Sequence, residues 1–265
     1  DRTGGFKVGA YASRRVRRLM PALMVCFVVV AFATAFFIHP GQISKWTSGT
    51  TAGMGWVANW KEIFSQNNYF DADQYSNPQP FRHVWSFAVE EQFYLFFPAL
   101  LALGWVVAIR RNRNARRITA LVLITIAAVS FPMSLFITTG RINPTGQGVP
   151  FAFYSAPTRA WEFAAGGLIA LSTATLMRMG KRLATALALA GVGLLAWASL
   201  AFDERTLFPG SAALLPVIGT VLLIAAGESQ APNFVNQILG TSPMQKIGDL
   251  SYSWYLWHWP FIVFA

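Results

Sequence analysis

The sequence predicts an all-α fold, a polytopic transmembrane helical bundle with about seven spans. Of its 265 residues, 54% are hydrophobic and only 12% are charged, whereas soluble domains carry roughly 25% charged residues. Seven segments also reach or approach the roughly 20 apolar residues that a helix needs to cross a bilayer core about 30 Å thick. Together they cover about half of the chain, which excludes a large soluble core and predicts a single membrane domain over residues 1–265.

The seven segments differ in the charges they carry. They are residues 19–38, 85–109, 118–138, 158–177, 183–202, 211–227 and 247–265. The first, third and fifth contain no charged residue, so their apolar length alone predicts a span. The second carries Glu90 and Glu91, the fourth Arg159 and Glu162, and the seventh Asp249. Ionisable groups inside a membrane are costly and point to function.

The basic residues predict the orientation of the bundle. Of the 21 lysines and arginines, 15 fall in the N-terminal segment and the alternate connections on its side. The positive-inside rule then places the N-terminus and the 110–117 loop in the cytoplasm and the long 39–84 connection on the outer side. The net charge of +10 is therefore a topology signal, and no nucleic-acid partner is expected.

Only one cysteine, Cys26, is present, so a disulfide framework and a cysteine metal site are both excluded. It lies in an apolar run, where we expect a small apolar filler. No metal site is predicted.

The strongest polar cluster precedes and enters the second segment. On a helix, His83, Ser86 and Glu90 fall on one face, where an imidazole and a carboxylate could orient each other for proton transfer. The alternative is a polar cap, with Glu90 or Glu91 in a salt bridge that serves packing only.

The seventh segment carries a second polar face, formed by Ser251, Tyr255 and His258. Pro260 should kink this helix and free the carbonyl of Leu256. Whether His258 is a structural hydrogen-bonding group or part of a site stays open.

In the fourth segment Arg159 and Glu162 are i, i+3 neighbours, which predicts an ion pair. Gly166 and Gly167 permit close approach of another helix. A structural role is the favoured interpretation of this segment.

Arginines precede the first segment in the run Arg14-Arg15-Val16-Arg17-Arg18. One interpretation is topology and contact with anionic headgroups. The alternative is a phosphate clamp, because guanidinium groups bind phosphate in a bidentate manner and Arg15 and Arg18 share a helix face.

Six motifs in this order resemble the acyltransferase 3 family of bacterial membrane acyltransferases, and most closely its polysaccharide and lipopolysaccharide O-acetyltransferases. They begin with Arg15-Val16-Arg17-Arg18-Leu19-Met20-Pro21, then Asn59-Trp60 with Tyr69-Phe70, and then residues 83–94, similar to His-x-Trp-Ser-Leu-x-x-Glu-x-x-Phe-Tyr with Phe87 for the usual Leu. Arg159-Ala160-Trp161-Glu162, Phe208-Pro209-Gly210 and residues 248–260 complete the series.

The resemblance implies transfer of an acetyl (acyl) group from cytoplasmic acyl-CoA to a sugar hydroxyl of a cell-surface glycan at the outer face. Acetyl-CoA would be a donor substrate, with no bound cofactor, and a glycan or lipid-linked sugar would be the acceptor. Arg14, Arg15 and Arg18 would bind the donor, and His83, Ser86 and Glu90 would be catalytic. The residues expected in support are Trp85, Glu91, Tyr94, Arg159, Glu162, Ser251, Tyr252, Tyr255 and His258. On this topology the arginines lie about a membrane thickness from His83 and Glu90.

The same resemblance implies that the chain is an internal portion of a longer protein in the bacterial cytoplasmic membrane. Family members carry a preceding helix pair with a histidine favoured as catalytic base. They also carry a further helix after the last segment and often a periplasmic SGNH-type domain. The competing interpretations are a transporter or flippase for a lipid-linked glycan, with buried charges lining a pathway, and a non-catalytic remnant or scaffold.

Overall fold

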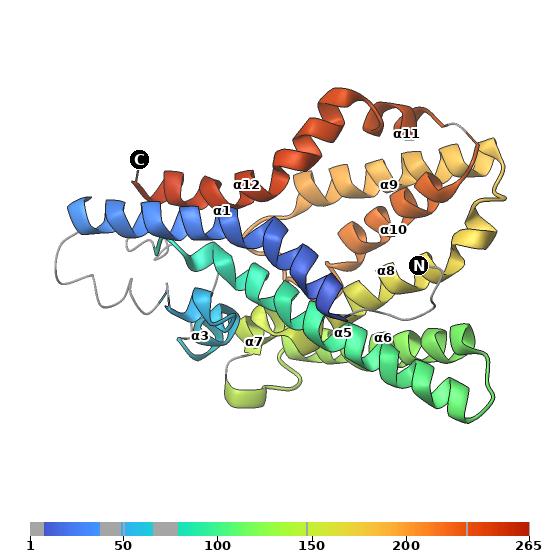
Figure 1. Ribbon diagram of the computed structural model, residues 1–265, viewed down its shortest axis with the longest axis horizontal. Helices are drawn as coiled ribbons and strands as arrows, with labels where there is room; N and C mark the ends of the chain where they lie inside the picture. Colours follow the sequence, from blue (N-terminus) through green and yellow to red (C-terminus); the bar gives the residue numbers. More distant parts are fainter. Residues whose placement is uncertain are drawn as a thin grey trace.

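A computed structural model describes residues 8–37, 49, 51–65, 79–146, 148–231 and 233–264, and throughout these ranges the regular structure is helical (Figure 1). The helices are α1 (Val8–Phe37), α3 (Ala58–Phe64), α5 (Trp85–Arg110), α6 (Ala115–Thr138), α7 (Gly148–Tyr154), α8 (Ala156–Leu176), α9 (Lys181–Ala201), α10 (Leu214–Glu228), α11 (Phe234–Leu239) and α12 (Ser242–Phe264). Short 3₁₀ turns η2 (Arg82–Val84) and η3 (Pro144–Gly146) precede α5 and α7. The predicted all-α fold class is confirmed.

The described part of each of the seven predicted segments falls mainly on one helix, but several boundaries differ. Helix α1 begins at Val8, well before the apolar run, because arginine is a good helix former and the run 14–18 continues the helix. Helix α10 begins only at Leu214, because turns occupy residues 208–213. Helix α12 begins at Ser242, five residues earlier than expected.

Among the described residues, four helical stretches are long and apolar enough to cross a membrane by length and composition: 9–34, 82–110, 115–138 and 181–201. Helix α10 is strongly apolar but has 15 residues. Helices α8 and α12 have 21 and 23 residues and carry more polar side chains. The chain is therefore a helical membrane protein.

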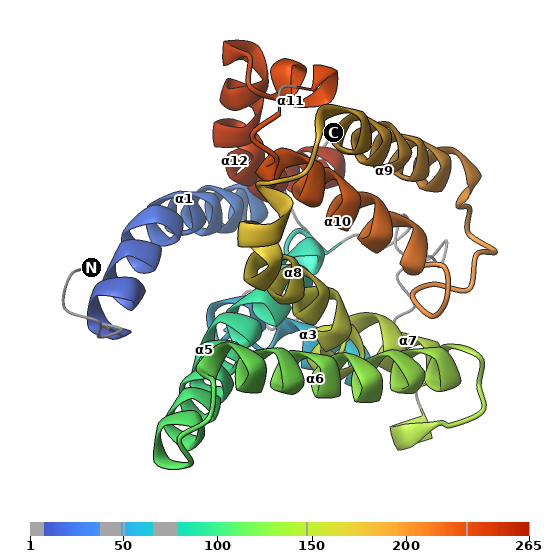
Figure 2. The ribbon, with the colours of Figure 1, turned by 90° about the vertical axis from the view of Figure 1, so that its right-hand side faces the viewer.

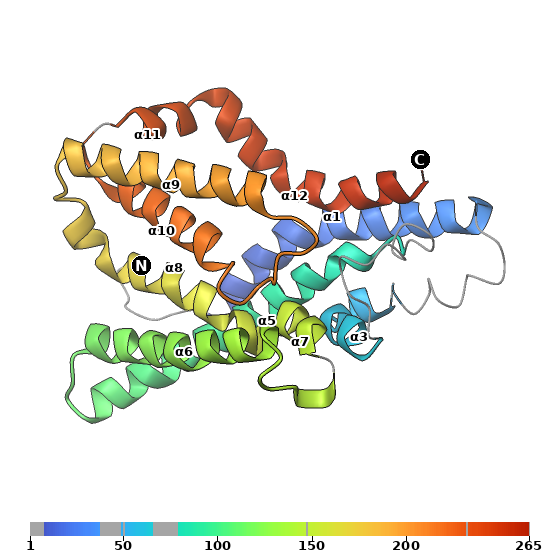
Figure 3. The ribbon, with the colours of Figure 1, turned by 180° about the vertical axis from the view of Figure 1, so that it is seen from behind.

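Helix α8 contacts α6, α10 and α5, and so connects the neighbouring helices of the bundle. Helix α9 lies beside α10, and α6 lies beside α8 (Figures 1 and 3). Helix α1 runs beside the C-terminal half of α12, and α5 lies against both α6 and α8 (Figures 1 and 2). The short helices α3 and α7 pack against the N-terminal part of α5. Within the predicted 39–84 connection, residues 39–48, 50 and 66–78 lie outside the described ranges, including the motif Tyr69-Phe70.

An apolar cluster positions α1 between α5 and α12. Its buried members are Leu23, Cys26, Phe27, Val30, Phe81, Val84, Phe87 and Leu256. The rings of Phe27 and Phe81 meet edge to face with centroids 4.5 Å apart, a favoured aromatic geometry. Because lipid tails are as apolar as these side chains, close van der Waals packing holds such helices together.

Cys26 does more than fill space in this cluster. It is only 1% exposed, and its Sγ donates to the carbonyl of Leu256 at 3.5 Å. Pro260 lies inside α12 four residues after Leu256, so it cannot donate to that carbonyl. The predicted free carbonyl is thus present, and the thiol of α1 occupies it.

Glycines bring α9 and α10 into close contact. A Cβ placed on Gly191 would lie 2.7 Å from the Gly219 carbonyl oxygen and 2.8 Å from Leu223 Cγ. In α8 a Cβ on Gly167 would lie 3.0 Å from Leu123 Cδ1, so the predicted close approach is confirmed there. Gly166 has no neighbour within 4 Å of that position and instead lines a cavity.

Gly191→Ala should therefore destabilise the bundle by about 1–3 kcal/mol, because the added methyl group meets backbone that cannot move aside. The measurement is the thermal unfolding midpoint of the protein in detergent. Gly193→Ala is the matched control two residues along α9, since nothing lies within 4 Å of its Cβ position. Equal midpoints for the two variants would contradict the close packing.

Candidate functional site

A cavity of about 570 Å³ lies between α1, α5 and α12. Its lining residues are Tyr11, Arg14, Arg15, Arg18, Leu19, Phe87, Glu90, Tyr94 and Tyr252. The α1 residues at positions 11, 14, 15 and 18 follow the i, i+3, i+4, i+7 spacing of one helix face. The three arginines that the sequence predicts as anion ligands therefore share one cavity with Glu90.

Arg15 is bound by Glu91 of α5. Its Nη2 lies 2.7 Å from Glu91 Oε1, and its Nε donates to both carboxylate oxygens at 3.0 and 3.2 Å. The guanidinium also stacks on Tyr94, with Cζ 3.2 Å from the ring centroid. A charge-assisted pair with this fork geometry is strong, so Arg15 fastens α1 to α5.

Arg15 and Arg18, which the sequence predicts as one phosphate clamp, therefore have different surroundings. Arg14 and Arg18 are exposed toward the cavity and make no ion pair with an acidic residue of the described ranges. They, rather than Arg15, are the cations available to an anionic ligand.

The adjacent carboxylates Glu90 and Glu91 have different surroundings, because successive residues of a helix point about 100° apart. Glu91 is buried in the ion pair with Arg15. Glu90 lines the cavity, makes no hydrogen bond to the described chain, and interacts electrostatically with both Arg15 and Arg159. The salt-bridge alternative therefore applies to Glu91, and Glu90 is the carboxylate left facing the cavity.

The expected separation of Glu90 from the arginines by a membrane thickness is wrong. Helices α1 and α5 run antiparallel, with Phe27 beside Phe81 and Arg15 beside Glu91. The helical extension of α1 back to Val8 carries the arginines alongside the N-terminal half of α5. The topology rule placed them at the end of a span, whereas ion pairing holds them beside it.

His83 lies outside the cavity, in a polar cluster between η2, α5 and α12. It is 3% exposed, and its ring is 5.4 Å from those of Tyr255 and His258. Its ring nitrogens lie near the carbonyls of Pro80 and Leu256 but make no hydrogen bond of standard geometry with the described chain. The structure thus brings His83 to α12 and not into hydrogen-bonding contact with Glu90.

Hydrogen bonds join the other members of this cluster. The Tyr255 hydroxyl donates to the His83 carbonyl, so Ser86, 2.7 Å from that hydroxyl, is the donor to it. His258 Nδ1 donates to the Tyr255 carbonyl at 2.7 Å. Ser251, expected on the same face, is exposed and bonds only the Gly248 carbonyl in the described chain.

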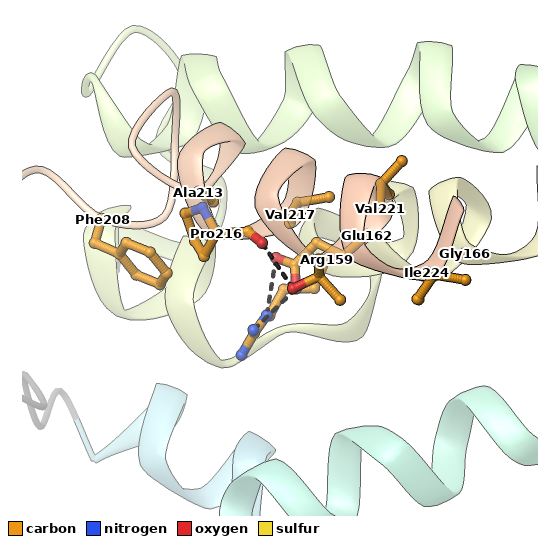
Figure 4. Close-up of a pocket in the computed structure, with 10 residues that line it drawn as sticks. Arg159, Glu162, Gly166, Phe208, Ala213, Pro216, Val217, Val221 and Ile224 are labelled. Atoms are coloured by element: carbon orange, nitrogen blue, oxygen red, sulfur yellow. Dashed lines mark hydrogen bonds and ion pairs between the residues drawn. The ribbon is translucent and has the colours of Figure 1, made fainter. Parts of the chain in front are cut away.

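The predicted pair in α8 is confirmed, with Arg159 Nη2 2.9 Å from Glu162 Oε2. Both residues line a second cavity of about 360 Å³ between α8 and α10 (Figure 4). The Arg159 guanidinium extends toward α5, where it lies 5.6 Å from the ring of Trp85. Trp85 packs in turn on Phe153 and Tyr154 of α7.

A buried amide pair was not predicted from the sequence. Asn59 of α3 is fully buried and accepts from Gln92 Nε2 at 3.0 Å, while its own Nδ2 donates to the Tyr154 carbonyl at 3.2 Å. The only sequence signal was the motif Asn59-Trp60. The pair ties α3 and α7 to α5.

A second contact of α3 is the buried ion pair between Glu62 and Arg82, with Oε2 and Nε 3.6 Å apart. Next to it Lys61 donates to Gln79 at 3.2 Å. Burial lowers the pKa of Lys61, and the neighbouring charge of Glu62 opposes that effect. The turn that carries His83 is therefore held from the α3 side as well.

These helices define a membrane protein with an arginine-lined cavity that a free carboxylate faces, an arrangement suited to an anionic ligand and proton transfer. A family model described as an acyltransferase domain matches residues 1–265, so the chain belongs to this acyltransferase family. The predicted resemblance is confirmed.

Among similar proteins are the peptidoglycan O-acetyltransferase OatA of Listeria monocytogenes, 29% identical over 94% of this chain, and the putative peptidoglycan O-acetyltransferase YrhL of Bacillus subtilis, 28% identical over 95%. A putative O-acetyltransferase of Staphylococcus aureus is 25% identical over the whole chain. The chain spans 39% to 42% of the length of these relatives. No solved structure matches.

Glu91→Leu should destabilise the protein by about 3 kcal/mol, because it leaves the Arg15 charge without its partner in a low-dielectric site. The double variant Arg15→Met with Glu91→Leu should recover most of that loss, since an apolar pair of similar size replaces the ion pair. Thermal unfolding of both variants measures this difference. A double variant no more stable than Glu91→Leu alone would contradict the assigned pairing.

Proposed function

We propose that this chain forms the membrane part of an O-acyltransferase that moves an acetyl or other acyl group from acyl-CoA to a sugar hydroxyl of a cell-surface glycan. Membership of the acyltransferase family supports the reaction class over the transporter alternative. The observation that carries the proposal is the cavity that contains both free arginines and the Glu90 carboxylate.

The donor fits the charge of this cavity. Coenzyme A is polyanionic, and Arg14 and Arg18 are the cavity cations without an ion pair in the described chain. Phosphate oxygens accept bidentate hydrogen bonds from guanidinium groups. Leu19, Phe87 and the ring of Tyr252 supply an apolar wall along which a pantetheine arm and an acyl chain can lie.

We assign Glu90 as the group that accepts the proton of the acceptor hydroxyl. In the transfer the acceptor oxygen attacks the thioester carbonyl, a C–O bond forms, the C–S bond breaks and coenzyme A leaves. The hydroxyl proton passes to the Glu90 carboxylate, which a positioned general base can accept. His83, Ser86, Tyr255 and His258 then act as positioning residues, because their cluster joins α12 to the start of α5.

The proposal also includes the orientation of the chain in the membrane and the identity of the acceptor. The bias of basic residues supports an orientation with the N-terminal end of α1 at the cytoplasmic side of a bacterial cytoplasmic membrane, where acyl-CoA is made. The names of the relatives from Listeria and Bacillus point to peptidoglycan as the acceptor, with lipopolysaccharide as the alternative glycan.

Arg18→Gln and Arg14→Gln should each weaken acetyl-CoA binding about tenfold, as expected for loss of one charge-assisted hydrogen bond to phosphate. Binding to the complete protein in nanodiscs is the measurement. Arg17→Gln is the matched control on the same helix, because Arg17 bonds Ser13 and does not line the cavity. Equal losses of binding in all three variants would contradict a specific donor site and indicate a nonspecific basic patch.

Glu90→Gln should retain acetyl-CoA binding but slow acetyl transfer to glycan about a hundredfold or more, the usual contribution of a general base. Transfer of radiolabelled acetyl groups in membranes that hold the complete protein measures this loss. Transfer at the wild-type rate would remove Glu90 from the mechanism. No transfer by the wild type would favour the non-catalytic alternative.

A further inference from the structure

The second cavity lies between α8 and α10 and is separate from the cavity that we propose for the donor. Its volume of about 360 Å³ is within the roughly 300–1,000 Å³ of small-molecule sites. Figure 4 shows the Arg159–Glu162 pair between Phe208 at one end and Gly166 with Ile224 at the other.

The lining combines a polar floor with an apolar wall. Arg159 and Glu162 bind each other in a bidentate manner, so their charges cancel. Along α10 the wall is formed by Pro216, Val217, Val221 and Ile224. Ile224 is 43% exposed, so the apolar end opens on the surface of the strongly apolar helix α10, which an apolar chain can contact.

The Arg159–Glu162 pair favours a neutral polar head group over an anionic one. A phosphate would meet the Glu162 carboxylate as well as Arg159, and that repulsion removes the benefit of the guanidinium. A sugar hydroxyl is both donor and acceptor, so it can donate to Glu162 and accept from Arg159. Phe208 adds an aromatic surface at the same end.

The location relates this cavity to the first. Glu90 lines the arginine cavity and interacts electrostatically with Arg159 of the second cavity. The ring of Trp85, from the same helix as Glu90, lies next to the Arg159 guanidinium. Helix α5 therefore contributes Glu90 to the cationic cavity and places Trp85 beside the neutral one.

We infer that the cavity between α8 and α10 binds the acceptor as a sugar-bearing lipid, with the neutral sugar on Arg159 and Glu162 and the apolar chain along Val217, Val221 and Ile224. This inference rests on the proposed function for its meaning as an acceptor site. The binding itself is independent of catalysis.

Two photoaffinity probes test the binding on the complete protein in nanodiscs. One is an alkyl glucoside with a diazirine in its chain, and the other is an alkyl phosphate with the same chain. The glucoside should label α10, and the phosphate should label it about tenfold less, because of the repulsion from Glu162. Equal labelling by both probes would overturn the inference and indicate an ordinary lipid groove.

Variants locate the label. Val221→Trp fills the cavity and should abolish labelling by the glucoside, whereas Ile218→Trp, on the exposed side of the same helix, should retain it. Glu162→Gln removes the carboxylate that is paired with Arg159 and should shift the preference toward the phosphate probe. Unchanged labelling in Val221→Trp, or unchanged preference in Glu162→Gln, would contradict the site.

Acetyl transfer separates this inference from the proposed function. If the wild type transfers acetyl groups and Val221→Trp does so with an unchanged KM for the acceptor, the acceptor site is elsewhere and the proposed function stands. If the glucoside labels α10 but the wild type transfers nothing, the cavity binds a sugar lipid and the proposed function fails.

Discussion

The structure around the site depends on one ion pair, between Arg15 of α1 and Glu91 of α5. A lone charge beside a membrane-spanning helix is expensive, so the two residues must meet, and their meeting determines how far α1 overlaps α5. With Arg15 engaged and stacked on Tyr94, the next residues on that face of α1 enclose the cavity. The free cations of Arg14 and Arg18 and the free carboxylate of Glu90 are consequences of this register.

The start of α5 connects four other helices, α1, α3, α7 and α12. Side chains there leave the helix in successive directions, so neighbours in the sequence reach different partners. Trp85 contacts α7, Ser86 contacts α12, Gln92 binds α3, and Glu91 binds α1. A short stretch of sequence thus gathers residues that are far apart along the chain, and a substitution there affects several contacts at once.

What sequence alone could predict follows the range of the interactions. Spans depend on local composition, and the pair of Arg159 with Glu162 depends on spacing within one helix, so both were predictable. Which of two adjacent glutamates binds Arg15 depends on the rotation of α5 against α1, which no local pattern contains. The burial of Asn59 likewise depends on the fold of α3 back onto α5. The motifs marked the important segments through resemblance, while the partners of their side chains required the tertiary structure.

The proline of α12 has a mechanical consequence. Where Pro260 interrupts the hydrogen-bond ladder, the carbonyl of Leu256 is held by the thiol of Cys26 in the neighbouring helix. At this interruption α12 is therefore bonded to α1, through a backbone carbonyl of α12 that accepts from a side chain of α1. The two helices are therefore linked at that point, and the helix linked to α12 is the one whose first turns carry the arginines.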